Sequence, residues 1–162
     1  DERERLEERL ADHLLPLVAK ARIVGGYAPL PDEISPTRAL DAALARGATM
    51  AFPAFAHPNE PFRFLAGQAS EPGPFGTMQP PAGAPAVHPD LVLVPLVAID
   101  RAFHRIGHGK GHYDRVLPEL RRRGALLIGV GWAVQRLDEP IPAEPWDVVL
   151  DGFATPDGVE LK

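Results

Sequence analysis

The amino-acid sequence predicts an α/β fold, a single domain over residues 1–162 with three layers (α/β/α) and a mostly parallel, Rossmann-like sheet. Two observations lead to this fold class. Short apolar segments alternate along the chain with segments whose apolar residues recur every three or four positions, as in strand–helix–strand units. The segment 91–99 (LVLVPLVAI) is apolar throughout, which is typical of a strand with both faces covered. Neither an internal repeat nor an interdomain linker interrupts this pattern.

The first strand–helix–strand unit is expected in the N-terminal third of the chain. Residues 1–20 predict an amphipathic helix, because leucines recur there at intervals of three or four. A short strand is expected within 21–30. Ser35 then predicts the N-cap of a helix that ends at Arg46, and 48–55 predicts the next strand.

The segment 56–90 is rich in proline and glycine. We expect one strand in it, at 62–67, and otherwise an ordered loop. The apolar strand that follows is expected to end or bulge at Pro95, because proline cannot donate a hydrogen bond within a sheet.

The second unit continues with a helix over 111–123. Pro118 lies inside this helix and is expected to kink or split it. Residues 125–132 predict a further buried strand, and 146–161 predict one or two short final strands.

Composition excludes several classes of function. The net charge of −5 gives no reason to expect binding to nucleic acid or to an anionic membrane. The absence of cysteine rules out disulfides, thiol catalysis and thiolate metal sites. The longest apolar run is too short to span a bilayer, and the charged first residues do not resemble a signal peptide. We therefore expect a cytoplasmic protein, and a monomer.

The stretch 105–114 (RIGHGKGHYD) is the strongest candidate for a functional site. It follows a predicted buried strand and precedes a predicted helix, so it lies where ligands bind in open α/β sheets. Glycine-rich backbone can present consecutive N–H groups to an anion, and the start of a helix adds its unpaired N–H groups. Lys110 adds a full positive charge, with Arg105 and His108 close by in sequence. The stretch predicts a phosphate site.

Other interpretations of this stretch stay open on the pattern alone. Its spacing is neither that of a Walker A motif nor G-x-G-x-x-G, and it could be a tight strand-to-helix turn with an exposed lysine. Asp114 could bind Mg²⁺ beside phosphates, or it could simply favour the positive end of the helix dipole.

These residues carry a resemblance to a known family. The segment 89–117 resembles the signature of the 5-formyltetrahydrofolate cyclo-ligases (5,10-methenyltetrahydrofolate synthetases), which includes a loop of the form R-x-G-x-G-K-G-Y-Y-D. Three further segments resemble blocks of that family in the same order: 27–34 (YAPLPDEI), 73–80 (GPFGTMQP) and 144–155 (EPWDVVLDGFAT).

The resemblance implies an ATP- and Mg²⁺-dependent ligase that converts 5-formyltetrahydrofolate to 5,10-methenyltetrahydrofolate, ADP and phosphate. It implies catalytic roles for Lys110 and Arg105 and metal-binding roles for Asp114 and Asp147. The implied ATP-binding residues are Arg105, Ile106, Gly107, His108, Gly109, Lys110, Gly111, His112 and Tyr113. The implied folate-binding residues are Ala28, Glu33, His108, Gly109, Lys110, Gly111 and His112.

The sequence departs from the family pattern at several places. His112 replaces the first tyrosine of Y-Y-D, Gln79 replaces a glutamate, and Trp146 stands where the family often has histidine. The family's basic N-terminal segment, which contributes to its ATP site, is expected to precede Asp1 in the natural protein. Several apolar side chains either line a pterin pocket or belong to the core: Tyr27, Phe52, Phe55, Phe75 and Met78.

Two other functions remain alternatives. One is a non-catalytic relative that binds folate or a nucleotide. The other is a sugar-phosphate isomerase or a CoA-transferase-like protein, because such folds also bind anions at strand ends.

Overall fold

The fold was analysed in a computed structural model that describes residues 1–108 and 111–162. Within them, eight strands form one sheet in the order β12-β11-β10-β7-β1-β2-β3-β6. The five central strands are parallel to one another: β11 (Gly152–Thr155), β10 (Leu126–Val130), β7 (Leu91–Pro95), β1 (Ile23–Gly25) and β2 (Thr49–Ala54). The outer strands are antiparallel: β12 (Gly158–Leu161), β3 (Arg63–Ala66) and β6 (Ala86–Val87). The predicted mostly parallel α/β sheet is confirmed.

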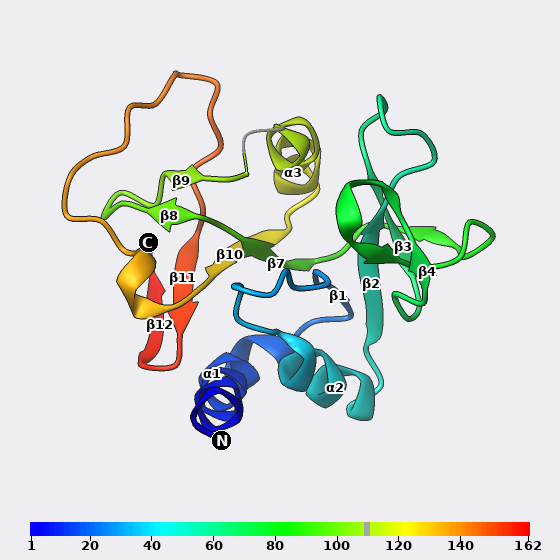
Figure 1. Cartoon of the computed structure of the whole chain (residues 1–162), viewed down its shortest axis with the longest axis horizontal. Coiled ribbons are helices and arrows are strands. Elements are labelled where there is room, and N and C mark those ends of the chain that lie inside the picture. Colours follow the sequence, from blue (N-terminus) through cyan, green and yellow to red (C-terminus); the bar gives the residue numbers. More distant parts are fainter. Residues whose placement is uncertain (109–110) are drawn as a thin grey trace.

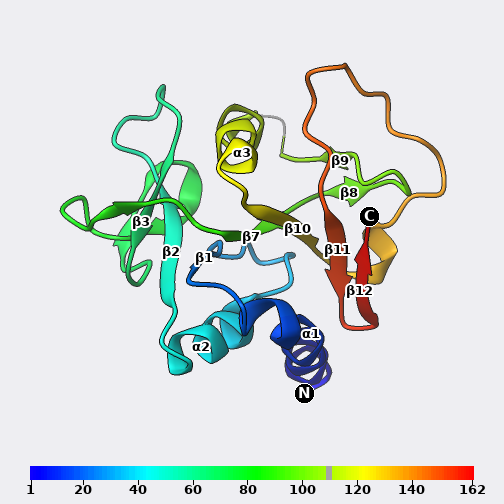
Figure 2. The ribbon, with the colours of Figure 1, turned by 180° about the vertical axis from the view of Figure 1, so that it is seen from behind.

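Helices cover both faces of this sheet, as Figures 1 and 2 show from opposite sides. Helices α1 (Glu2–Val18) and α2 (Thr37–Ala45) lie on one face, and α3 (His112–Arg122) lies on the other. The predicted three layers are therefore present. Among the residues described, no helix is both long enough and apolar enough to cross a membrane.

The core lies in two clusters, one on each face of the sheet. Leu91 and Leu93 of β7 pack in the cluster beneath α1 and α2, whereas Val92 and Val94 pack in the cluster beneath α3, together with Leu117. Side chains along a strand point alternately to opposite faces, so a strand buried on both faces must be apolar at every position. This explains the uninterrupted apolar run in the sequence.

Two predictions about the helices are corrected, the N-cap of α2 and the split of α3 at Pro118. Helix α2 begins at Thr37, with Pro36 rather than Ser35 at the N-cap, because the carbonyl of Pro36 accepts the helical bond from Leu40 N at 3.0 Å. The Ser35 hydroxyl accepts a bond from Thr37 N at 3.2 Å instead. Helix α3 passes through Pro118 without a break, since a proline removes only one helical donor.

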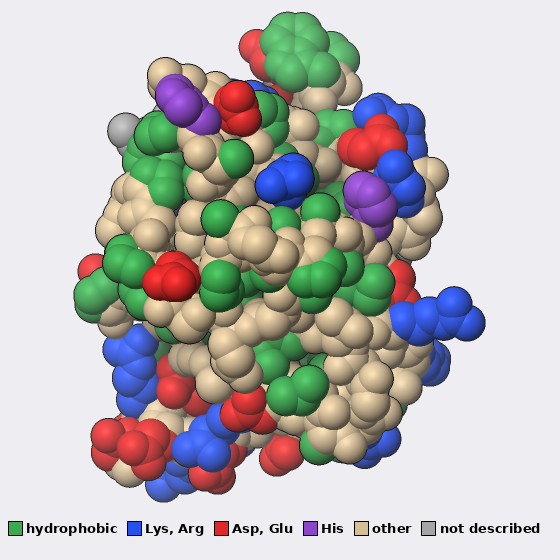
Figure 3. All heavy atoms as spheres, turned by 90° about the vertical axis from the view of Figure 1, so that its right-hand side faces the viewer, with side chains coloured by type: hydrophobic (Ala, Val, Ile, Leu, Met, Phe, Trp, Pro, Cys, Tyr) green, Lys and Arg blue, Asp and Glu red, His purple; other side chains and the backbone are tan. Residues whose placement is uncertain are grey.

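The connection 56–90 contains more structure than the single predicted strand. Besides β3 and β6 it forms a small antiparallel pair, β4 (Glu71–Pro72) with β5 (Met78–Gln79), around the short helix η1 (Pro74–Gly76). The space-filling view of this side of the molecule shows charged side chains of both signs at its lower end, toward α1 and α2 (Figure 3).

The path from β7 to α3 also differs from the prediction. Strand β7 ends at Pro95, as expected, but a two-stranded hairpin of β8 (Ala98–Ile99) and β9 (Arg105–Ile106) follows it. The glycine-rich stretch therefore continues from β9 rather than directly from the buried strand. Asp100, which is 2% exposed, holds the hairpin turn by accepting bonds from Ala102 N (3.0 Å) and His104 N (2.9 Å).

Candidate active site

The main cavity lies at the carboxyl ends of β1, β2 and β7. From β1 the chain crosses through α2 to β2 on one side, and from β7 it crosses through α3 to β10 on the other. Such a reversal of direction opens a crevice between neighbouring parallel strands, where open α/β sheets bind ligands. The cavity has a volume of about 600 Å³ and is lined by Tyr27, Ala28, Leu30, Glu33, Pro53, Phe55, Phe62, Phe75, Thr77, Met78, Pro95, Arg105, Ile106, Gly107, His108, Gly111, His112, Tyr113, Asp114, Ile141 and Pro142.

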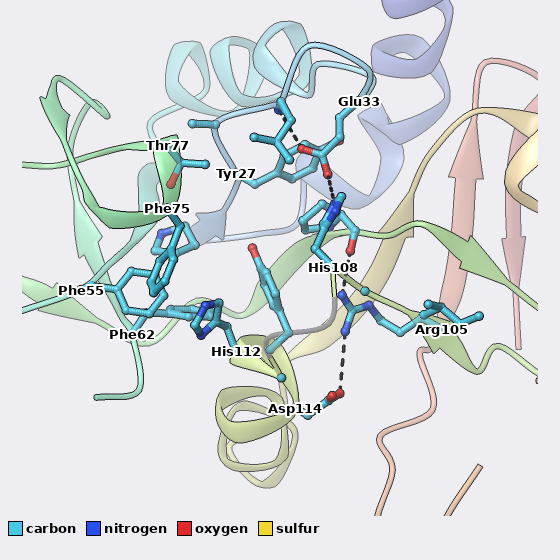
Figure 4. A pocket seen from close by; sticks show the side chains of 18 of the residues that line it. Tyr27, Glu33, Phe55, Phe62, Phe75, Thr77, Arg105, His108, His112 and Asp114 are labelled. Atoms are coloured by element: carbon cyan, nitrogen blue, oxygen red, sulfur yellow. Dashed lines mark hydrogen bonds and ion pairs between the residues drawn. The ribbon is translucent and has the colours of Figure 1, made fainter. Parts of the chain in front are cut away.

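Glu33 presents one carboxylate oxygen toward this cavity. It lies in residues 28–36, the Glu33 loop, which follows β1. Its Oε1 accepts a bond from Leu30 N at 2.8 Å, and its Oε2 lies 3.2 Å from His108 Nε2. The Glu33 side chain is only 11% exposed. A ligand that hydrogen-bonds to Oε2 therefore meets His108 beside it (Figure 4).

Tyr27 supports the same loop from beneath. Its hydroxyl donates to the carbonyl of Ile34 at 2.6 Å. Burial raises the pKa of Tyr27 well above its ordinary value, and the nearby Glu33 raises it further. Tyr27 therefore remains a neutral hydrogen-bond donor.

Arg105 provides a buried positive charge at the other end of the cavity. Its side chain is 6% exposed, its Nη2 donates to Pro95 O at 3.1 Å, and its Nη1 lies 3.7 Å from Asp114 Oδ1. The guanidinium carbon lies 5.3 Å from the centre of the Tyr113 ring. Burial lowers the pKa of Arg105, while the negative charges of Asp114 and Glu33 raise it. Arginine nevertheless stays charged in proteins, so the cavity keeps a fixed cation.

Tyr113 lies beside this guanidinium and contacts Phe62 with a ring-centre distance of 5.0 Å. Burial raises the pKa of Tyr113, and Arg105 lowers it by less. The phenol is therefore neutral and can donate or accept a hydrogen bond.

The start of α3 faces the same end of the cavity. Its N-cap is Gly111, in the left-handed conformation (φ 69°), a position that glycine occupies at little cost. Gly111 has no side chain, so the first N–H groups of α3 receive no bond from an N-cap side chain. The start of a helix is a favourable position for an anion.

Aromatic side chains form another wall of the cavity, here called the aromatic wall: Phe55, Phe62, Phe75 and His112 (Figure 4). The rings of Phe55 and Phe75 lie 4.8 and 4.7 Å from that of His112, centre to centre. Tyr27 and Met78 also line the cavity, whereas Phe52 is buried in the core beneath α1 and α2. Of the two alternatives for Phe52, pterin pocket or core, the structure therefore supports the core.

Gln79 holds the backbone of the aromatic wall. Its side-chain oxygen accepts a bond from Phe55 N at 3.0 Å, and its side-chain nitrogen donates to Phe55 O at 3.2 Å. An ionised glutamate, the usual family residue, could accept the first bond but could not donate the second.

Asp147 does not line the main cavity. It lies with Asp114 at a smaller side hollow of about 80 Å³, which also touches His104 and Arg105. The Oδ2 of Asp147 accepts a bond from Glu144 N at 2.7 Å. Within the described parts of the chain, no group of three or more potential metal ligands is present. Two carboxylates fit Mg²⁺, which commonly uses one or two together with phosphate and water oxygens.

All the other site residues predicted from the sequence line the main cavity, where described. Gly109 and Lys110 lie outside the described residues, so their roles stay predictions. Sequence reasoning missed several lining residues: Leu30, Pro53, Phe62, Thr77, Ile141 and Pro142. Ile141 N donates to Asp100 Oδ2 at 2.8 Å, a contact across 41 positions that no local pattern reveals.

The fold and the cavity define an α/β protein with a cavity at the carboxyl ends of its strands, the place where open α/β sheets bind small molecules. The sequence model of the 5-formyltetrahydrofolate cyclo-ligase family matches residues 1–156. The 5-formyltetrahydrofolate cyclo-ligase of Mycolicibacterium smegmatis is 34% identical over 167 residues, covering 95% of this chain and 84% of that protein. The chain therefore belongs to the 5-formyltetrahydrofolate cyclo-ligase family.

Matches to other relatives are shorter, and the solved structures agree on the fold. The Haemophilus influenzae enzyme is 33% identical over 54% of this chain, which is 49% of its own length. The NMR structure of Aquifex aeolicus 5,10-methenyltetrahydrofolate synthetase superimposes with a TM-score of 0.79 at 28% identity, covering 99% of this chain and 82% of that one. The Mycoplasma pneumoniae synthetase gives 0.75 at 21% identity over 96% of this chain and 87% of that one, a likeness of fold alone.

Proposed function

We propose that this protein catalyses the ATP- and Mg²⁺-dependent cyclisation of 5-formyltetrahydrofolate to 5,10-methenyltetrahydrofolate, releasing ADP and phosphate. The observation that carries the proposal is the make-up of one cavity. Glu33 offers a carboxylate oxygen at one end, and Arg105 and the start of α3 offer positive charge and backbone N–H donors at the other.

The folate would bind with its pterin ring against Glu33. A pterin ring presents neighbouring N–H groups, for which a carboxylate held at one oxygen by Leu30 N is a suitable acceptor. The aromatic wall supplies flat, apolar contact for a ring system.

The ATP phosphates would bind at the other end. The first N–H groups of α3 and the guanidinium of Arg105 supply the donors there. Lys110, placed here by the sequence motif, would add the charge that the transferring phosphoryl group needs. Asp114 and Asp147 would hold Mg²⁺, which neutralises phosphate charge when bound.

The chemistry has two steps. The formyl oxygen attacks the γ-phosphorus of ATP, and the bond from that phosphorus to the β–γ bridging oxygen breaks, releasing ADP. N10 of the folate then attacks the activated formyl carbon and loses its proton, and phosphate leaves with the former formyl oxygen. The protein's part is to hold the two substrates in line and to exclude water.

The test is to mix the protein with 5-formyltetrahydrofolate and Mg·ATP and to follow the absorbance of the methenyl product. We expect product only when ATP and Mg²⁺ are both present, with one ADP per turnover. Binding of both ligands without turnover would contradict the proposal and identify a non-catalytic relative. A cytoplasmic location and a monomeric state belong to the same proposal, and light scattering after size exclusion tests the second.

A further inference from the structure

Four consecutive residues of the Glu33 loop have a backbone polar group bound by a side chain. The carbonyl of Asp32 accepts a bond from Trp132 Nε1 at 3.0 Å. The carbonyl of Glu33 accepts one from Arg3 Nη2. The carbonyl of Ile34 accepts the Tyr27 hydroxyl, and the N–H of Ser35 donates to Glu7 Oε2 at 2.9 Å.

Three of these side chains come from elements that the cavity does not include. Arg3 and Glu7 lie on α1 and are themselves paired, with Arg3 Nε 3.5 Å from Glu7 Oε2. Trp132 follows β10, and the guanidinium carbon of Arg3 lies 5.6 Å from the centre of its ring. Its own backbone N–H donates to Gln135 Oε1 at 2.7 Å. The three side chains form one connected group.

These bonds affect the cavity through the backbone of the Glu33 loop. Holding the backbone of residues 32–35 fixes where the Glu33 side chain begins. Leu30 N then fixes one carboxylate oxygen and leaves the other toward the cavity. A carboxylate that is held in place before binding loses less conformational freedom when a ligand arrives.

We propose that Arg3, Glu7 and Trp132 are positioning residues that set the Glu33 carboxylate for ligand binding. The inference rests on the proposed role of Glu33 in folate binding. Helix α1 lies on the opposite face of the sheet from α3. Its side chains would then affect the affinity for folate, at the Glu33 end of the cavity, but not the affinity for ATP at the Arg105 end.

The test compares Arg3→Met with Arg5→Met, because Arg5 lies on the same helix but pairs with Glu2. We expect Arg3→Met to raise the Kd and KM for 5-formyltetrahydrofolate by about 5- to 10-fold, as expected for the loss of a charge-assisted hydrogen bond. The KM for Mg·ATP should stay within about twofold, which also shows that the fold is intact. Trp132→Phe keeps the ring and loses the N–H, and Glu7→Gln keeps an oxygen for Ser35 N, so both should give smaller effects.

Two readouts separate positioning from a general loss of stability. In a Glu33→Gln background, Arg3→Met should add little further loss of folate affinity, because the effect passes through Glu33. Amide hydrogen exchange at Leu30 and Ser35 should be faster in Arg3→Met than in Arg5→Met, with or without folate.

The outcomes are distinct. If the wild type neither binds nor turns over 5-formyltetrahydrofolate, the proposed function fails, and hydrogen exchange still decides the positioning. If Arg3→Met matches Arg5→Met in exchange and in folate Kd, or if its effect persists in full beside Glu33→Gln, the positioning role is overturned.

Discussion

The two ends of the main cavity are built differently. At the Glu33 end, side chains from α1 and from the segment after β10 hold the backbone, and the carboxylate is 11% exposed. At the Arg105 end, the guanidinium is 6% exposed but its partner Asp114 is 60% exposed, at the open start of α3. The comparison indicates that the first end is shaped before its ligand arrives. The second end carries its positive charge beside an exposed carboxylate and the start of a helix, an arrangement that suits a charged ligand.

The largest effect is expected from Lys110→Ala, which should impair phosphoryl transfer at the Arg105 end of the cavity and leave folate binding unchanged. Removing a donor to charge that develops in the transition state lowers turnover by about 100- to 1000-fold. The measurement is kcat from methenyl absorbance, with folate Kd unchanged and circular dichroism as a check on folding. Lys110→Arg keeps the charge and serves as the control. Near-normal turnover in Lys110→Ala would remove Lys110 from the phosphate site.

Glu33→Gln should weaken ligand binding at the Glu33 end of the cavity. The amide would present a donor to a pterin donor, and an unmatched pair in a cavity costs about 1–3 kcal/mol, so folate KM should rise about 10-fold or more. The KM for ATP should change less than about twofold. Asp32→Asn is the matched control, since its exposed side chain lies in the same loop. An equal rise in KM for folate and for ATP would argue against separate binding of the two substrates at the two ends of the cavity.

Asp100→Asn tests what supports the Arg105 end. Burial raises the pKa of Asp100, but bonds from the N–H groups of Ile141, His104 and Ala102 outweigh it, so the net pKa is lowered. The amide would turn a donor toward Ile141 N or His104, and stability at pH 7 should fall by about 1–3 kcal/mol.

The pH dependence of this loss follows from the lowered pKa. Asp100 stabilises the fold fully above its unfolded pKa of about 3.9, and this stabilisation is lost as pH falls through the lower folded value. Urea unfolding of both proteins from pH 7 to pH 3 should therefore show a constant difference down to about pH 5 and a shrinking one below about pH 4. A difference that does not vary with pH would show that the charge of Asp100 is unimportant.

The smallest effect is expected from Asp114→Asn. Asparagine keeps an oxygen ligand but loses the charge that a hard cation prefers, so the Mg²⁺ concentration for half-maximal turnover should rise about fivefold. Asp41→Asn, at an exposed position on α2, is the control. An unchanged Mg²⁺ requirement would leave Asp114 only as a partner of Arg105 and of the helix dipole.

The sequence predicted the layers of the fold because they depend on local periodicity. The uninterrupted apolar run of β7 and the leucine spacing of α1 are visible in any short window. The hairpin β8–β9 was not predictable in this way. It depends on Asp100 accepting bonds from later residues and on Phe103 at a φ of 67°, a conformation that phenylalanine does not signal.

The site residues likewise fall into those that a local pattern predicts and those that only distant contacts bring to the cavity. Glu33 and the glycine-rich stretch carry motifs and were found, whereas Ile141 lines the cavity and donates to Asp100 across 41 positions, which no motif signals. Phe52 and Phe55 looked alike in sequence. Phe52 lies on β2 and Phe55 directly follows that strand, three positions later, and an odd spacing in extended chain places side chains on opposite faces.

The contact between Glu33 and His108 joins residues 75 positions apart, and that between Asp32 and Trp132 joins residues 100 positions apart. An unfolded chain holds neither pair together, so a ligand of this cavity binds the folded state and not the unfolded one. By mass action, occupancy at about 100 times Kd adds about 2.7 kcal/mol to the free energy of unfolding. The lifetime of such a protein against proteolysis in a cell would then rise and fall with the supply of its own substrate.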